Sequence, residues 1–155
     1  MSQPSTNNPF NETSDPDRHE IWQRLMIADT RAFVAGDFTL IETDFDAEHF
    51  EGVRCFHSAD PADWRIVFAD LASYRASWQK AAEEWRGRPA EETFQELLSR
   101  IRLDQIEIVG HRALAHKRFI RADRQTLYRL HKRGAGWKVV GFLGFLPLHT
   151  VDRAC

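Results

Sequence analysis

The aspartate at position 29 occupies a place where the sequence pattern calls for an apolar side chain. Leu25 lies four residues before it and Phe33 four residues after it, so the carboxylate falls within the apolar face of a predicted helix. An ionised carboxylate is costly in apolar surroundings unless it is paired or its pKa rises, and a carboxyl group with a raised pKa can act as a general acid or base near neutral pH. The alternative is structural: Asp29 caps a loop or pairs with a buried arginine.

Polar side chains also occur on both faces of a predicted strand near residue 116. One face carries Leu114, His116, Arg118 and Ile120, and the other carries Ala113, Ala115, Lys117 and Phe119. If the first face lines a pocket, His116 can move protons near neutral pH and Arg118 can hold a carboxylate or enolate oxygen with two N–H groups. The alternation by itself slightly favours the opposite interpretation, in which both side chains point to solvent or to a partner.

The composition limits the classes of protein to which this chain can belong. With 155 residues it has the length of one domain, and its formal net charge of −2 argues against nucleic acid as the main partner. Two cysteines, Cys55 and Cys155, are too few for a disulfide framework, so we expect a reducing, cytoplasmic setting. No apolar run reaches the roughly 20 residues that a membrane span needs. The histidines lack a ligand spacing and no phosphate-binding loop occurs, so we predict no metal and no cofactor.

Helical patterns fill the first half of the chain. The first begins at Asp15, followed by Pro16, and ends at Gly36. A short helix is predicted over 38–44, and 49–57 is predicted to be a strand or an extended connection. A third helix is predicted from Asp60–Pro61 to Gly87. Its apolar face carries three tryptophans and a tyrosine, which indicates core packing, the wall of a pocket, or both (Trp64, Tyr74, Trp78 and Trp85).

Strands dominate the rest of the chain. They are predicted over 96–109, 112–122, 125–133 and 137–147, with glycines in two of the turns. The last strand is apolar on both faces, which indicates that both are covered. Helices can cover one face, and a second copy of the protein is the simple cover for the other, so we predict a homodimer formed through the sheet.

The ends of the chain differ in composition from its centre. Residues 1–14 are polar and rich in Asn, Ser, Thr and Pro, which predicts a disordered or loosely docked arm. A single domain is predicted over 15–149, and 150–155 is predicted to be a flexible tail.

The order of these elements resembles the NTF2-like superfamily, which includes ketosteroid isomerase, scytalone dehydratase and the SnoaL-like polyketide cyclases. The likeness covers about 16–148 and rests on residues 34–37, 40–45, the Trp64–Trp78 helix, and a closing hairpin from 126–130 to 136–140. It implies an α+β fold: a cone of three N-terminal helices packed on a curved, mostly antiparallel sheet that encloses a pocket. The superfamily holds enzymes, carriers and assembly domains, so the fold alone transfers no activity.

The resemblance to ketosteroid isomerase implies roles for several polar residues. It turns the face with His116 and Arg118 inward, and it places Asp29 and Tyr128 where that enzyme has its oxyanion-binding tyrosine and protonated aspartic acid. The aspartate that shuttles the proton there has no counterpart near Gly52, so steroid isomerisation is not predicted. Scytalone dehydratase, which eliminates water, uses a comparable set of tyrosine, aspartate and histidine.

Two functions from different classes follow. In the first, the pocket binds a small, mostly apolar molecule, and a cofactor-independent isomerase, dehydratase or cyclase reaction uses acid/base proton transfer. The predicted catalytic residues are Asp29, His116 and Tyr128, and the predicted ligand-binding residues are Trp22, Phe33, Trp64, Tyr74, Trp78, Arg118 and Phe142. In the second, the protein is a non-catalytic ligand-binding or dimerisation module in which Asp29 and Arg118 form a buried structural pair.

Overall fold

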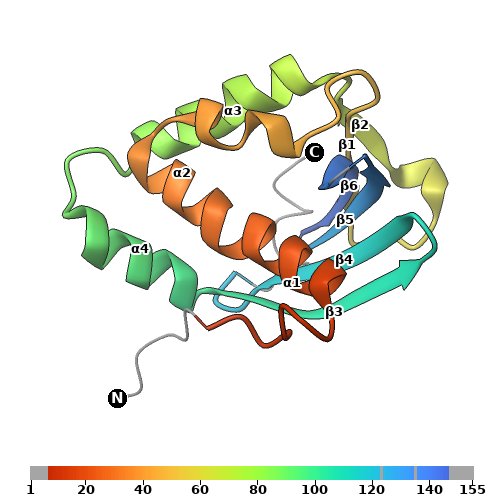
Figure 1. Cartoon of the computed structure of the whole chain (residues 1–155). Helices are drawn as coiled ribbons and strands as arrows, with labels where there is room; N and C mark the ends of the chain where they lie inside the picture. The colour runs from red at the N-terminus through yellow and green to blue at the C-terminus, as the bar shows by residue number, and fades with distance from the viewer. Residues whose placement is uncertain (1–6, 123, 135, 147–155) are drawn as a thin grey trace.

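The computed structural model describes residues 7–122, 124–134 and 136–146 of the chain. A curved sheet has the strand order β2-β1-β6-β5-β4-β3, with every neighbouring pair antiparallel except β1 and β6. Helices pack on one face of this sheet, where α3 and α4 lie on either side of the long N-terminal helix (Figure 1). The fold is therefore α+β with a curved sheet, as the sequence predicts.

The first helix runs without a break from Pro16 to Ala35. It consists of α1 (Pro16–Trp22), a π-helical turn (Gln23–Ala28) and α2 (Asp29–Ala35). The Asp15 side chain accepts a hydrogen bond from the backbone N–H of Arg18, and Gly36 ends the helix with a φ of 67°. The predicted boundaries are confirmed, but the π-helical turn immediately before Asp29 left no signal in the sequence.

The segment after this helix departs from prediction. Two 3₁₀ turns, Phe38–Leu40 and Glu42–Asp44, take the place of one short helix and lead to β1 (Glu51–Phe56). A helix from Asp60 is wrong, because Asp60 caps only a 3₁₀ turn (Pro61–Asp63) before β2 (Arg65–Phe68). The β-branched residues of β2 favour a strand over a helix. The helix α3 (Leu71–Glu83) begins later, where the Asp70 carboxylate accepts from the N–H of Ser73 at 2.8 Å.

A second departure lies at residues 90–100. The predicted strand over 96–109 is in fact α4 (Ala90–Ser99) followed by β3 (Ile101–Val109). Two glutamates in its first turn suit the positive end of a helix dipole, and buried Phe94 and Leu98 are four residues apart on one face. The remaining strands are confirmed as β4 (Arg112–Phe119), β5 (Arg124–Arg133) and β6 (Gly136–Phe145).

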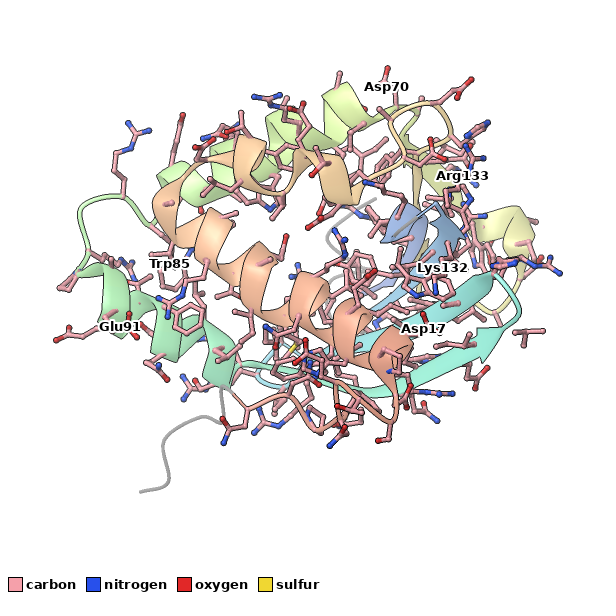
Figure 2. All side chains as sticks on the ribbon, in the orientation of Figure 1. Asp17, Asp70, Trp85, Glu91, Lys132 and Arg133 are labelled. Atoms are coloured by element: carbon pink, nitrogen blue, oxygen red, sulfur yellow. The ribbon has the colours of Figure 1, made fainter. Side chains whose placement is uncertain are left out.

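The core lies between the sheet and the helices. Trp137, Ile21 and Phe94 are among its fully buried side chains. The Trp137 indole N–H and the Lys132 ammonium both donate to Asp17 Oδ1, at 3.0 and 2.9 Å. These contacts tie α1 to the last hairpin, and Figure 2 labels Asp17 and Lys132. These two hydrogen bonds lower the pKa of the Asp17 carboxyl group.

A bulge in β6 changes which of its side chains face the helices. Gly141 has a φ of 158°, and a Cβ at this position would lie 2.3 Å from Glu51 O, so only glycine fits. The bulge places Trp137, Val139 and Phe142 on the helix side, whereas strict alternation assigns Phe142 to the opposite face. The aromatic ring of Phe142 thereby enters the space between sheet and helices.

Part of the predicted N-terminal arm contacts α1. The Asn8 side-chain amide donates to His19 O at 2.8 Å, and the His19 ring Nδ1 lies 2.8 Å from Phe10 O. Residues 1–6 and the predicted tail at 150–155 lie outside the described residues. Among the helices that the structure describes, none is long and apolar enough to cross a membrane.

Candidate functional site

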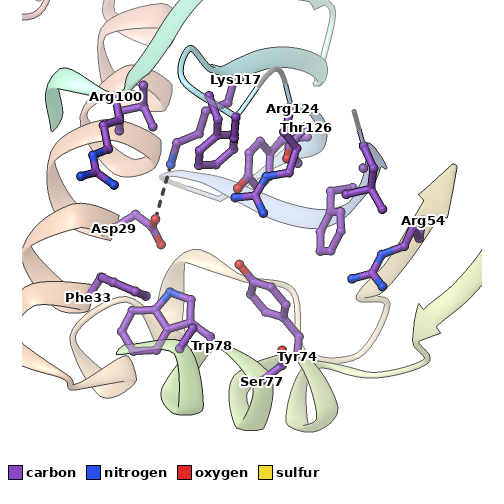
Figure 3. A pocket seen from close by; sticks show the side chains of 18 of the residues that line it. Asp29, Phe33, Arg54, Tyr74, Ser77, Trp78, Arg100, Lys117, Arg124 and Thr126 are labelled. Atoms are coloured by element: carbon purple, nitrogen blue, oxygen red, sulfur yellow. Dashed lines mark hydrogen bonds and ion pairs between the residues drawn. The ribbon is translucent and has the colours of Figure 1, made fainter. Parts of the chain in front are cut away.

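A cavity of about 580 Å³ lies between the helices and the sheet (Figure 3). Its walls come from α2, α3, the C-terminal end of α4 and all six strands of the sheet. A volume of this size is typical of a site for a small molecule. Six of the predicted site residues line it: Asp29, Phe33, Tyr74, Trp78, Tyr128 and Phe142.

Two predicted residues of β4 lie on the wrong face. Ala115 and Lys117 point toward the helices, and Lys117 is only 3% exposed. The Arg118 side chain, in contrast, is 52% exposed and pairs with Asp104 at 2.5 Å. His116, one residue before Lys117, does not line the cavity. The inward orientation predicted for His116 and Arg118 is therefore wrong. Lysine is rarely buried, but the long apolar stem of Lys117 can cross the core and carry its ammonium group to polar partners.

Two predicted tryptophans are also absent from the cavity wall. Trp22 is buried in the core. Trp64 lies before β2 and not on a helix, and its ring meets that of Phe145 at a centroid distance of 6.3 Å. Its indole N–H donates to Ser58 O at 2.8 Å. Both tryptophans therefore pack the fold, and their predicted contact with a ligand is not supported.

Asp29 is held at the cavity wall by an ion pair with Lys117. Lys117 Nζ lies 3.4 Å from Asp29 Oδ2 and donates to Leu25 O at 2.8 Å (Figure 3). The π-helical turn shapes this contact, because the N–H of Asp29 donates to Arg24 O, five residues back, and not to Leu25 O. The partner of Asp29 is thus Lys117, and the predicted pair with Arg118 is wrong.

Two phenol groups lie deep in the same cavity. Burial raises the pKa of both Tyr74 and Tyr128, and the negative charge of Asp29 raises each further. Both hydroxyl groups therefore remain protonated at neutral pH and can donate hydrogen bonds. The ring of Phe142 lies between them, with centroid distances of 5.5 Å to Tyr74 and 6.2 Å to Tyr128.

Aromatic rings form the middle of the cavity. Phe33 meets Trp78 edge-on at 5.5 Å, and Phe68 lies 5.4 Å from Tyr74 and 6.1 Å from Phe142. Such edge-to-face and tilted contacts fix the rings against one another. The cavity therefore has a preformed apolar surface that suits a flat aromatic or an alicyclic ligand.

The basic residues that line the cavity are not the one that the sequence predicts, Arg118. Lys117, Arg54 and Arg124 all line it. The alternation of β4 offered a signal for Lys117, because Ala113 and Ala115 mark a face close to the helices. Arg54 lies within β1 and Arg124 is the first residue of β5, and the sequence alone does not show which way either side chain points.

A separate group of possible metal ligands lies outside this cavity. Within the described ranges, Asp46, Glu48 and His49 have ligand atoms within 4.8 Å of one another, and two of the three residues are exposed. Asp46 Oδ2 already lies 3.1 Å from His49 Nδ1 and 2.9 Å from His131 Nε2. Burial alone would raise the pKa of the Asp46 carboxyl group, but the contacts with His49, the N–H of Glu48 and the charge of Arg133 together lower it. Asp46 therefore lies at the centre of a network of ion pairs.

Comparison with solved structures shows the NTF2-like fold. An NTF2-like protein of unknown function from Silicibacter pomeroyi DSS-3 superposes with a TM-score of 0.53 at 15% identity, covering 81% of this chain and 88% of that one. Another from Shewanella oneidensis MR-1 gives 0.51 at 12% identity over 81% and 96% of the two chains. A domain of unknown function with a cystatin-like fold from Nostoc punctiforme PCC 73102 gives 0.50 at 18% identity over 93% and 85%. No protein-family model and no curated protein sequence matches the chain.

Proposed function

We propose that the cavity binds a small, mostly apolar molecule and that Asp29 exchanges a proton with it. This is the chemistry of a cofactor-independent isomerase, dehydratase or cyclase. One observation carries the proposal: among the described residues that line the cavity, Asp29 is the only carboxylate, and it faces aromatic walls and two protonated phenols. A single carboxylate that lines a cavity beside protonated hydroxyl groups is a candidate general acid or base.

The proposed step moves one proton and one electron pair. The Asp29 carboxylate takes a proton from a carbon next to a carbonyl group, and the electrons of the C–H bond move to the carbonyl oxygen. The resulting enolate oxygen accepts a hydrogen bond from the hydroxyl of Tyr128 or Tyr74. Return of the proton to the same or another carbon completes the reaction. His116, on the outer face of β4, takes no part.

Binding is tested with N-phenyl-1-naphthylamine, a neutral dye that fluoresces in apolar surroundings. We expect saturable binding to the wild-type protein and a loss of affinity of about 10- to 100-fold in Gly144→Leu, because the leucine branches enter the cavity. A Cβ on Gly144 meets its nearest neighbours at 3.7 Å or more, so the backbone accepts the change.

The matched control is Val140→Leu, which enlarges a side chain of the same strand on the opposite face. It should leave dye affinity unchanged, and circular dichroism should show both variants folded. If the wild-type protein and Gly144→Leu bind the dye with equal affinity, the dye binds elsewhere and the cavity is not its binding site.

We further propose that the outer face of the sheet forms a homodimer. Leu127 pairs with Leu143 on that face, next to Val140, and all three are only partly buried within one chain. Burying such side chains against a second copy is favourable. Sedimentation equilibrium at micromolar concentration should show a dimer, and Leu143→Arg should shift it to monomer. A monomeric wild-type protein contradicts this proposal and leaves the cavity proposal intact.

A further inference from the structure

Positive charge exceeds negative charge around the cavity. Five of its lining residues are basic and one is acidic: Arg54, Arg100, Lys117, Arg121 and Arg124 against Asp29. The chain as a whole has a formal charge of −2, so this excess is local. A concave, partly apolar site concentrates the field of such charges and attracts ions of the opposite sign.

Two of the five basic groups already have carboxylate partners. Lys117 contacts Asp29 at 3.4 Å, and Arg100 contacts Glu96 at 2.5 Å. For Arg54, Arg121 and Arg124, no carboxylate of the described residues lies within ion-pair distance. Three guanidinium groups therefore border the cavity with their charges unmatched in this part of the chain.

Arg54 and Arg124 are placed to act together. They come from β1 and β5, the two neighbours of β6, and both guanidinium groups project into the cavity in Figure 3. Arg124 is steadied by the ring of Phe119, whose centroid lies 4.1 Å from its Cζ. Burial lowers the pKa of Arg124, and the positive charge of Arg54 acts in the same direction, as expected for two like charges that border one cavity. Arginine nevertheless stays charged, so an anion between the two relieves their repulsion.

We propose that the natural ligand is a carboxylate, with its anionic group held between Arg54 and Arg124 and its apolar body against Trp78 and Phe142. Guanidinium groups bind carboxylates through two parallel N–H···O bonds, which fixes orientation as well as charge. This inference rests on the proposed function, because it takes the same cavity as the binding site. It narrows the ligand from a small apolar molecule to an aromatic or alicyclic acid.

The test compares two nearly isosteric competitors that differ in charge. 2-Naphthoate and 2-naphthamide are each titrated against bound N-phenyl-1-naphthylamine. Hydrogen bonds to charged groups contribute more than neutral ones, so we expect the acid to displace the dye about 10- to 100-fold more strongly than the amide at low salt. The ratio should fall as salt rises. In Arg54→Gln and Arg124→Gln, with each displacement referred to that variant's own dye affinity, the ratio should fall toward one.

The matched control is Arg112→Gln, which removes an exposed arginine outside the cavity and should keep the wild-type ratio. Equal displacement by acid and amide, or a ratio that neither cavity variant alters, overturns the carboxylate inference and leaves the cavity as a site for neutral molecules. Absence of dye binding to the wild-type protein overturns both proposals. Because each arginine is tested separately, failure of one variant to fold still leaves the other to decide.

Discussion

Asp29→Asn is expected to slow proton exchange on a bound ketone by about 10²- to 10⁴-fold, the usual contribution of a positioned base. The probe is 2-tetralone, whose fused ring suits the aromatic walls and whose carbon next to the carbonyl bears acidic protons. Incubated in D₂O with wild-type protein, it should gain deuterium faster than in buffer alone, as followed by proton NMR. Asparagine has nearly the same shape as aspartate but cannot accept the proton.

Two controls show whether a slower exchange comes from the loss of the Asp29 carboxylate. Asp104→Asn removes an exposed carboxylate that pairs with Arg118 outside the cavity, and it should exchange at the wild-type rate. Dye titration should show that Asp29→Asn still binds N-phenyl-1-naphthylamine. If 2-tetralone occupies the cavity but exchanges at the buffer rate with wild-type protein, then Asp29 is not a base, and non-catalytic binding of a ligand is the better description.

Lys117→Met is expected to reduce the free energy of unfolding by about 3 kcal/mol, at the lower end of the range for breaking a buried ion pair. Methionine keeps the apolar stem, but Leu25 O loses its donor and Asp29 loses its counter-charge. The loss stays at the lower end because Asp29 borders the cavity, where water can hydrate it. Urea unfolding of wild type and variant measures the difference.

The double variant Asp29→Asn with Lys117→Met separates charge from packing. Removing both charges should recover part of the lost stability, because no unpaired carboxylate then remains. Lys132→Met is the control, because it makes the same substitution in a partly exposed ion pair, that of Lys132 with Asp17. We expect it to lower the free energy of unfolding much less than Lys117→Met does. A Lys117→Met variant as stable as wild type contradicts the buried pair described here.

Much of the fold could be predicted because local signals agreed with the tertiary structure. Asp15 and Gly36 mark the two ends of the first helix, and the turn glycines mark the final strands. Asp29 was found because a charged residue in an apolar stripe conflicts with the pattern. Both the apolar stripe and the charged residue lie within one helix, so the sequence alone reveals the conflict.

Other features depended on contacts between distant segments and could not be predicted. Asp60 followed by Pro61 predicts the start of a helix, but residues 65–68 pair with β1 as strand β2, and the helix begins only at Asp70. The faces of β4 were ambiguous, because a buried lysine looks like a surface residue until its partner Asp29, 88 residues away, is placed beside it. The bulge at Gly141, where the backbone comes close to Glu51 of another strand, likewise turns Phe142 inward.

Occupation of the cavity by a small apolar molecule can be seen in NMR contacts between N-phenyl-1-naphthylamine and protein methyl groups. We expect nuclear Overhauser effects from the dye to the methyls of Val67, Ala81 and Thr126, which line the cavity from β2, α3 and β5. Contacts only with Leu127 and Val140, on the outer face of the sheet, would contradict the account.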